Sequence, residues 1–519
     1  MDPGSALQDF LQPLHVDVQK IHTLSRLFYS NFKDLALNAH DQFLPTPISE
    51  SILRPVSQHG HGSGGTNLRV GFVELLGAEA THLTTNGNSP PTLRVKEKAW
   101  PIDNALKAES SASPQQLFDW IGNRIATVVR EALQEWPSLA DDSSVPLPLG
   151  LTFSFPMTQN SISDATVMTM GKGFSIKGDA ELGPLILRGY DKARETEETN
   201  GDGATTKLPP IRIAAISNDA VSTLISYIYL SPPTSKASMG LIVGTGCNAT
   251  IPLKLSLLGP AKQPSNVSLL PGESARDVRI AVNTEWSIRG TAPPLRELDL
   301  ITPWDAALDA ALLGPGEITG FQPLEYMTAG RYLGELGRLM LVAYLESTGV
   351  DENTLPPKLR ASYGLTTTFL SHFKPADGST MLSKLEAEFP PDPSSPFRWT
   401  EETAQALYEM AKVIELRAAG IVAAATVALL RLAEDIPERD SLADGGGEAR
   451  ELGVGYTGGC ISHFQNYLAD TQMFLAEIVK LEFDGRPPVK VVLSPCHDGG
   501  IKGAGILAAA AGVSEKQEV

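Results

Sequence analysis

The sequence has little cysteine, no surplus of positive charge and no internal repeat. Only three cysteines occur in 519 residues, which excludes a disulfide framework and indicates a reducing compartment. Lysine and arginine total 42 against 60 aspartates and glutamates, and the formal net charge is −18. An acidic surface is repelled by nucleic acids and by anionic membranes, so we expect neither as a partner.

Targeting and membrane-spanning segments are also absent from the sequence pattern. The first twenty residues mix polar and apolar side chains and contain Pro3 and Pro13, unlike a signal peptide. The longest apolar run, near residue 420, is too short to cross a bilayer. We therefore expect a cytoplasmic protein without membrane insertion. The sequence leaves the oligomeric state open.

The composition is that of a globular protein. Hydrophobic residues make up 42% and charged residues 20% of the chain, and its length allows two or more domains with cores of their own. Residues 14 to 33 predict a helix with Val18, Ile21, Leu24 and Phe28 on one face. We expect this helix to dock on the body of the protein.

Polar residues follow two predicted strands. GLTFSFP (150–156) alternates apolar and polar side chains until Pro156 ends the strand. IRIAAIS (211–217) is a buried strand that leads into Asn218, Asp219 and a helix. The carboxyl edge of an α/β sheet is where ligands bind, and phosphoryl transfer needs a base there. Taken alone, Asp219 would more often be a helix cap.

A third stretch joins two predicted strands through glycines. MGLIVGTGCNATI (239–251) reads as strand, tight turn and strand, with Gly244, Thr245 and Gly246 in the turn. Glycines let backbone amides approach a phosphate without Cβ atoms in the way. Hairpins use such turns as well, so the turn alone does not decide its role.

The order of these motifs resembles the eukaryotic hexokinase family over residues 20 to 512. TFSFP and the later MGKGF resemble the family's sugar-binding signature, NDA its NDT element and GTGCNA its second phosphate element. Further matches are AVNTEWSIRG (281–290), FQPLEYMTAGRYLGELGR (321–338), VGYTGGCISHF (454–464) and SPCHDGGIKGAG (494–505). Each match is degenerate by itself, and their order carries the resemblance.

The resemblance implies a fold, an activity and a set of site residues. The fold is a two-lobed α/β actin-like ATPase (ribonuclease H-like) fold of the hexokinase type, with a small lobe of residues 58–218 plus 488–519 and a large lobe of 1–57 plus 219–487. The activity is transfer of a phosphoryl group from ATP, with Mg²⁺, to the 6-hydroxyl of a hexose, with Asp219 as the catalytic base. Sugar binding falls on Ser154, Phe155, Pro156, Gly171, Lys172, Asn218, Asn248, Glu285 and Glu325. Nucleotide binding falls on Gly64, Gly65, Thr66, Asn67, Arg69, Gly244, Thr245, Gly246, Gly458 and Gly499. No residue is assigned as a metal ligand.

One departure from the family pattern bears on activity. SQHGHGSGGTNLRVGFVELLG (57–77) keeps the glycines of the first phosphate loop, but Gly62 stands where the family has an aspartate that holds magnesium through water. Residues Gln58 to Ser63 cannot form a buried apolar strand. The chain is therefore either a degenerate, non-catalytic relative or an intact enzyme with a local alteration. The sugar-contact residues and Asp219 favour the second account.

Other departures bear on the substrate. The family's WTKGF becomes MGKGF (170–174), which makes space beside Lys172, and Ser287 and Arg289 replace a glycine and an apolar residue. This set resembles the fungal N-acetylglucosamine kinases and predicts N-acetylglucosamine as the substrate. Glucose or mannose is the alternative. A different class of alternative is a catalytically impaired regulator of carbon or starvation response.

Overall fold

The computed structural model describes residues 3–53, 59–63, 68–75, 93–102, 114–136, 145–168, 181–195, 208–231, 235–313, 319–375, 380–439 and 449–517. The chain forms two compact units. The first comprises residues 1–35, 242–248 and 286–494, and the second comprises residues 36–241, 249–285 and 495–519. Each unit is described by itself below. The lobe boundaries given by the resemblance stay a prediction.

The second unit contains a five-stranded mixed sheet. In spatial order its strands are β4 (Leu93–Trp100), β3 (Leu68–Leu75), β2 (His59–Ser63), β5 (Leu147–Phe153) and β8 (Ile211–Asn218). β2, β5 and β8 run parallel to one another, whereas β3 is antiparallel to both β2 and β4. The predicted strands before Pro156 and before Asp219 are thus confirmed as neighbours in one sheet.

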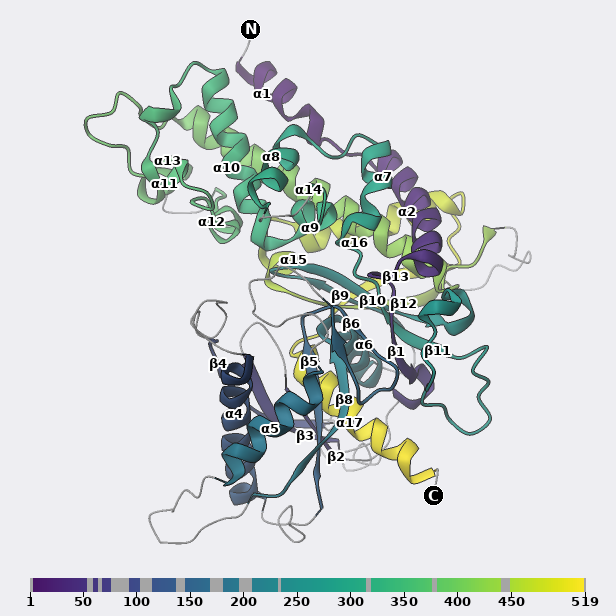
Figure 1. The fold of residues 1–519 in the computed structure, drawn as a ribbon. Coiled ribbons are helices and arrows are strands. Elements are labelled where there is room, and N and C mark those ends of the chain that lie inside the picture. Colours follow the sequence, from purple (N-terminus) through teal and green to yellow (C-terminus); the bar gives the residue numbers. More distant parts are fainter. Residues whose placement is uncertain are drawn as a thin grey trace, which may run out of the picture. The chain divides into compact units, whose positions relative to one another are not determined.

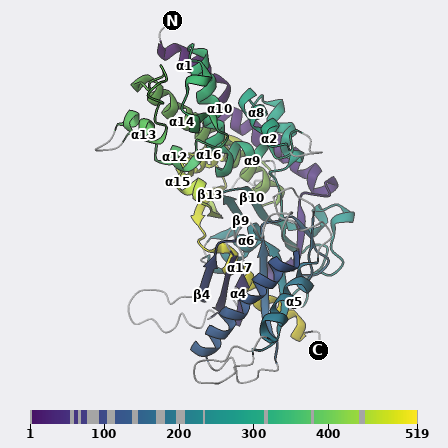
Figure 2. The same cartoon turned by 60° about the vertical axis from the view of Figure 1, so that its left-hand side comes forward.

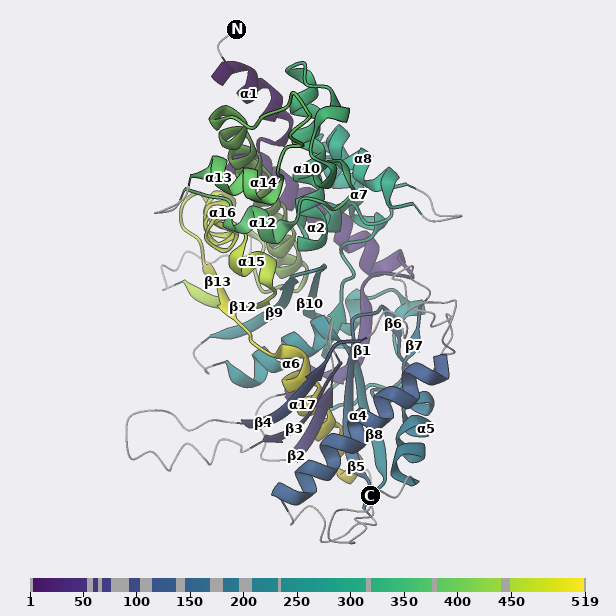
Figure 3. The same ribbon diagram turned by 90° about the vertical axis from the view of Figure 1, so that its left-hand side faces the viewer.

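Helices cover both faces of this sheet. Val70 and Phe72 of β3 join a core cluster with α4 (Pro114–Glu135) and α5 (Leu182–Glu195) (Figure 1). Val73 and Leu75 of the same strand join another cluster with α6 (Asp219–Leu230) and α17 (Gly499–Gln517) (Figure 3). Successive strand residues point to opposite faces, so one strand supplies both clusters.

The segment that carries Gly62 forms the central strand of the sheet. β2 has the sequence HGHGS, and Gly62 lies opposite Gly71 of β3 and Gly150 of β5. We expected that Gln58 to Ser63 could not form a buried apolar strand, yet the backbone of residues 59–63 pairs as a strand. Strand pairing uses backbone N–H and C=O groups, which every residue except proline possesses. The neighbouring strand β3 supplies apolar side chains to the core clusters on both faces of the sheet.

Glycines of the terminal motif allow α17 to approach its neighbours closely. A Cβ atom at Gly503 would lie 1.9 Å from the carbonyl oxygen of Ser222 in α6. A Cβ atom at Gly505 would lie 2.5 Å from the Cβ atom of Val73 in β3. Real Cβ atoms do not come so close to other atoms, so these glycines are needed for packing and do more than cap a helix.

The second unit holds a second group of strands. β1 (Leu44–Ser49), β11 (Arg279–Asn283), β10 (Cys247–Lys254) and β9 (Lys236–Val243) are neighbours in that order. β11 is antiparallel to both β1 and β10, and the boundary between the units falls within β9 and β10. A short ribbon of β6 (Met157–Thr158) and β7 (Thr166–Val167) completes the strands of this unit.

The first unit is mainly helical (Figure 2). Its helices are α1 (Pro3–Leu11), α2 (Val18–Asn38, of which the last three residues belong to the second unit), α7 (Ala292–Glu297), α8 (Pro303–Ala311), α9 (Pro323–Thr328), α10 (Gly330–Ser347), α11 (Pro357–Arg360), α12 (Thr367–His372), α13 (Met381–Glu388), α14 (Glu401–Leu432), α15 (Gly459–His463) and α16 (Tyr467–Glu482). Its strands β12 (Arg450–Thr457) and β13 (Val489–Pro495) are neighbours.

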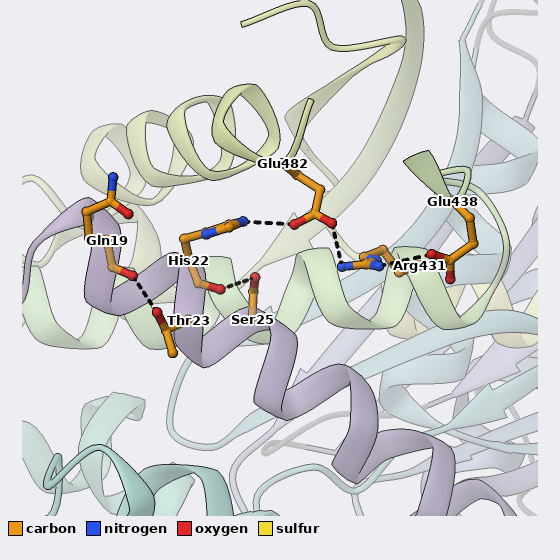
Figure 4. Close-up of polar contacts among 7 residues, drawn as sticks. All are labelled: Gln19, His22, Thr23, Ser25, Arg431, Glu438 and Glu482. Carbon is orange, nitrogen blue, oxygen red and sulfur yellow. Dashed lines mark hydrogen bonds and ion pairs between the residues drawn. The ribbon is translucent and has the colours of Figure 1, made fainter. Parts of the chain in front are cut away.

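The predicted N-terminal helix is confirmed as α2, which packs on α14 and α16. Ile21, Leu24 and Phe28 are fully buried. Polar contacts add to this packing (Figure 4): Glu482 of α16 accepts from the His22 ring at 2.8 Å and pairs with Arg431 of α14 at 3.0 Å. The apolar stripe and the hydrogen bond from His22 to Glu482 together fix the helix on the first unit.

The apolar run near residue 420 belongs to α14, which is 32 residues long. Among the described helices it is the one long and apolar enough to cross a membrane, so the expectation that the run is too short was wrong. However, 89% of its apolar stretch is buried inside the protein, and a Cβ atom at Gly420 would lie 2.6 Å from Ile21. Such burial is typical of a core helix. The cytoplasmic location stays a prediction.

Candidate active site

At the carboxyl end of β8, one residue caps the following helix and the next residue supplies the carboxylate. Asn218 is the N-cap of α6, because its side-chain oxygen accepts a hydrogen bond from the Ala220 amide at 2.8 Å. Its side-chain nitrogen donates to the carbonyl oxygen of Phe155 at 3.2 Å. Asp219 is the first helical residue and is half-buried. The cap that the NDA sequence suggested is therefore made by Asn218, not by Asp219.

Asp219 is held by the TFSFP segment. The Ser154 hydroxyl donates to Oδ2 of Asp219 at 2.6 Å, although the two residues are 65 positions apart. Ser154 and Phe155 are half-buried, and Pro156 is buried. A short hydrogen bond from a hydroxyl to a carboxylate is strong and directional. It orients Asp219 at the sheet edge where α/β proteins bind ligands.

Glu285 follows β11 in the same unit and is 6% exposed. Its Oε1 atom accepts a hydrogen bond from the Asn283 side-chain amide at 2.9 Å. The carboxylate of this predicted sugar residue is thus held by the last residue of the preceding strand, β11.

The glycine turn of the first unit rests on the start of α10. The Gly244 amide closes the turn on the carbonyl oxygen of Gly246 at 2.9 Å. The amides of Gly330 and Arg331 donate to the carbonyl oxygens of Gly244 and Thr245 at 2.8 and 3.3 Å. The predicted turn is confirmed, and the start of a helix fixes its carbonyl groups.

Glu325 of α9 reaches the same turn. Its Oε2 atom accepts a hydrogen bond from the Cys247 amide at 3.3 Å. A Cβ atom at Gly246 would lie 3.1 Å from that oxygen, so the glycine makes room for the carboxylate. Because the amides of Gly244 and Cys247 bind within the protein, those of Thr245 and Gly246 are the candidates for a phosphate.

Gly458 packs against this turn from the other side. Its φ angle is 123°, and a Cβ atom there would lie 2.2 Å from the carbonyl oxygen of Val243. Both facts require glycine. Asn248, at the start of β10, is half-buried. The structure therefore brings Gly244, Gly246, Glu325 and Gly458 together in the first unit.

Two residues were expected to reshape the sugar pocket, but one is bound to the backbone and the other is exposed. Ser287 is buried, and its hydroxyl donates to the carbonyl oxygen of Cys247. Arg289 is exposed. A hydroxyl engaged by the backbone gives no support to a substrate preference.

Burial also raises the pKa of Cys247 to about 12, which keeps its thiol protonated and unreactive at neutral pH.

The remaining predicted nucleotide residues are only partly described. Arg69 of β3 pairs with Asp498 at 2.9 Å, and both side chains are partly exposed. Gly499 begins α17, where a Cβ atom would lie 3.0 Å from Cα of Thr223. Gly64, Gly65, Thr66, Asn67, Gly171 and Lys172 lie outside the described residues.

Sequence reasoning missed Arg331. Its amide holds Thr245 of the turn, and its side chain is exposed. It is a cation placed one residue after the glycine that supports the turn. The signal was present in the sequence as the GR pair of TAGRYLG, but only the backbone contact with the turn reveals its place.

Comparisons with known proteins agree with these motifs. Family models for hexokinase match residues 6–229 and 238–510, and the second match alone covers more than half of the chain. The chain belongs to the hexokinase family. It is 28% identical to Hexokinase-1 of Nicotiana tabacum over 86% of this chain and 78% of the relative. It is 30% identical to Hexokinase of Kluyveromyces lactis over 59% of this chain and 54% of the relative.

A solved hexokinase shows the same fold. The Schistosoma mansoni hexokinase complexed with glucose aligns with a TM-score of 0.71 and 22% identity, covering 98% of both chains. The predicted fold class, the two-lobed actin-like ATPase fold of hexokinases, is thereby confirmed. The hexokinase family consists of sugar kinases that use ATP, generally with Mg²⁺, so the expected class of activity is confirmed at that level.

Proposed function

We propose that this protein is an ATP-dependent kinase that phosphorylates the 6-hydroxyl group of a hexose. The observation that carries the proposal is the hydrogen bond from Ser154 to Asp219. It joins two separate family motifs and holds a carboxylate at the end of a parallel strand. Membership of the hexokinase family supports the same activity.

Asp219 has the role of general base in this proposal. It accepts the proton of the 6-hydroxyl group while that oxygen forms a bond to the γ-phosphorus of ATP. The bond from the γ-phosphorus to the bridging oxygen breaks, and ADP leaves with that oxygen. A correctly placed base contributes about 10²- to 10⁴-fold to such a rate. Ser154 keeps the carboxylate in one orientation during the transfer.

The other predicted residues bind the two substrates. Glu285, Glu325 and Asn248 offer carboxylate and amide groups to the sugar hydroxyls, since an ionised carboxylate accepts hydrogen bonds in fixed directions. The amides of Thr245 and Gly246 approach a phosphate at the turn. Arg331 of α10 has an exposed side chain, and its amide binds the Thr245 carbonyl oxygen of the same turn. Among the described residues no group of three or more His, Cys, Asp or Glu side chains could hold a metal ion. Mg²⁺ bound together with ATP would neutralise phosphate charge, and in such sites one or two carboxylates hold the ion alongside the substrate phosphates.

The substrate remains to be chosen among hexoses. The Ser287 hydroxyl is bound to the backbone and does not support a preference for N-acetylglucosamine. That preference therefore depends on the MGKGF segment, which lies outside the described residues. The relatives named hexokinase favour the alternative substrate glucose. A second candidate function, sugar sensing without transfer, is favoured by one observation: Gly62 occupies the centre of the sheet without a side chain.

The test is ADP release by the purified chain with ATP and magnesium, comparing glucose, mannose and N-acetylglucosamine. Binding of each sugar is measured in parallel by calorimetry without ATP. Turnover of any of the three supports the kinase, and the preferred sugar settles the substrate. Sugar binding without turnover would support the sensor. Neither binding nor turnover would overturn the proposed function.

A further inference from the structure

The backbone of Glu285 has a conformation that residues other than glycine seldom adopt. Its φ angle is 44°, in the left-handed region, between the end of β11 and the fully buried Trp286. This region is sterically unfavourable for a residue with a Cβ atom, because that atom comes too close to the following carbonyl oxygen. Such a conformation persists where the surrounding structure holds it.

Two neighbouring residues, Gln42 and Phe43, hold this backbone. Gln42 is 1% exposed, and its side-chain amide donates to the carbonyl oxygen of Glu285 at 2.9 Å. The Phe43 amide donates to the carbonyl oxygen of Thr284 at 3.1 Å. The two consecutive carbonyl groups that set the path of the chain at Glu285 are thus both bound by the segment before β1.

The segment that carries Gln42 is itself fixed. Lys262 donates to the carbonyl oxygen of Gln42 at 2.7 Å, and its ammonium group lies 5.7 Å from the centre of the Phe43 ring. Gln42 is therefore held by its main chain and holds Glu285 by its side chain. Together with the hydrogen bond from Asn283 to the carboxylate, this arrangement fixes both ends of Glu285.

We propose that Gln42 is a positioning residue for hexose binding, which acts by holding the backbone of Glu285 so that its carboxylate faces the sugar. The proposal rests on the proposed function, in which Glu285 accepts hydrogen bonds from sugar hydroxyls. Without the Gln42 amide, the buried carbonyl oxygen of Glu285 has lost a partner, and the left-handed backbone can relax. The carboxylate then moves relative to the sugar, while the nucleotide-binding elements of the first unit are unchanged.

The experiment compares Gln42→Leu with wild type in the full chain. Hexose affinity is measured by calorimetry without ATP, using the sugar that wild type binds best, and KM values are measured for hexose and ATP. We expect the hexose Kd and KM to rise about tenfold, with the KM for ATP and kcat within twofold of wild type. Gln263→Leu is the matched control, since its amide also donates to main-chain carbonyl groups, those of Leu255 and Leu258. It should leave the hexose Kd within twofold.

Coupling to Glu285 distinguishes positioning from a general loss of structure. Glu285→Gln should weaken hexose binding, and adding Gln42→Leu to it should weaken binding by less than a further twofold. If Gln42→Leu does not fold, Gln42→Met is read in the same way, because its unbranched side chain has a similar length and no hydrogen-bond donor.

The possible failures are distinct. Three outcomes would each overturn the positioning role and leave the proposed function standing. They are an unchanged hexose Kd in Gln42→Leu, additive effects in the double variant, and an equal loss of hexose binding, ATP binding and kcat. A wild-type chain that neither binds nor phosphorylates a hexose would overturn the proposed function, and the positioning role with it.

Discussion

The strands β2 and β8 belong to the same sheet but owe their places to different causes. β8 reads IRIAAISN, and Ala214 to Asn218 are all buried. β2 reads HGHGS and contains no apolar side chain, yet it lies between β3 and β5 at the centre. β8 is followed directly by Asp219, whose carboxylate Ser154 holds, whereas β2 has Gly62 near its end.

This difference separates what a strand needs for pairing from what it needs for chemistry. Backbone groups suffice for pairing once neighbouring strands and helices bury the sheet, so β2 keeps its place without apolar residues. Chemistry depends on the side chains at the strand's end, and there the sequence of β2 provides no carboxylate. A strand can thus keep its place in the sheet although it lacks the carboxylate expected near its end.

The largest expected effect concerns the end of β8. Asp219→Asn removes the base but keeps the shape of the side chain. We expect kcat to fall about 10³-fold, with the hexose Kd within threefold of wild type. Turnover is measured by ADP release and binding by calorimetry. Asp191→Asn, an exposed acid on α5, is the control and should leave kcat unchanged. Full activity in Asp219→Asn would remove the distinction between the two strand ends.

The second test gives β2 the group that it lacks. Gly62→Asp places a carboxylate in the central strand, and we expect kcat to rise about 10²-fold, because fixed charge at a phosphoryl-transfer site contributes on that order. Gly62→Asn has the same shape without the charge and should not raise kcat. Equal effects of the two variants, or none in either, would show that Gly62 does not limit activity.

A third test compares Asp219 with a carboxylate that the fold buries. The pKa of Glu415 is raised to about 8, mainly because the side chain is buried. The negative charge of Asp470 and a hydrogen bond with it raise this pKa further. Between the unfolded value of 4.5 and about 8 the folded chain binds more protons. Stability is therefore full below that window and decreases as the pH rises through it.

Glu415→Gln should remove this dependence and raise the free energy of unfolding at pH 8 by about 2 kcal/mol, since each pKa unit corresponds to about 1.4 kcal/mol and local rearrangement relieves part of the cost. Urea denaturation at pH 5 and pH 8 measures it. Glu401→Gln, exposed on the same helix, should show no such gain. A wild-type stability that does not fall between pH 5 and pH 8 would contradict a protonated Glu415.

The smallest expected effect concerns the neighbour that supports β2. A Cβ atom at Gly71, the register partner of Gly62, would lie 2.6 Å from the carbonyl oxygen of Lys96 and 2.8 Å from Ile501. Gly71→Ala should therefore lower the free energy of unfolding by about 1.5 kcal/mol. At Gly183 the nearest atom would be 3.5 Å away, so Gly183→Ala should instead be neutral or stabilise by about 0.5 kcal/mol. Equal urea midpoints for the two variants would show that the sheet has room at Gly71.

The candidate site was predictable where a motif is continuous in sequence. The apolar run before Asn218 and the glycines from Gly244 to Gly246 were sufficient to predict the strand ends and the turn, and the order of motifs was sufficient for the family. These features depend on side-chain periodicity and on residues within a few positions of one another. The contacts of Ser154 with Asp219 and of Gly246 with Glu325 join residues 65 and 79 positions apart, and no local pattern encodes them.

The sequence by itself determined the family, the helix α2 and the acid at the end of β8. The tertiary structure decided that β2 is a strand, that α14 is a core helix, that Ser287 binds the backbone and that Gln42 holds Glu285. The physical reason is the same in each case. Periodicity reports which side chains share a face, whereas pairing, burial and hydrogen-bond partners depend on which other segments that face meets.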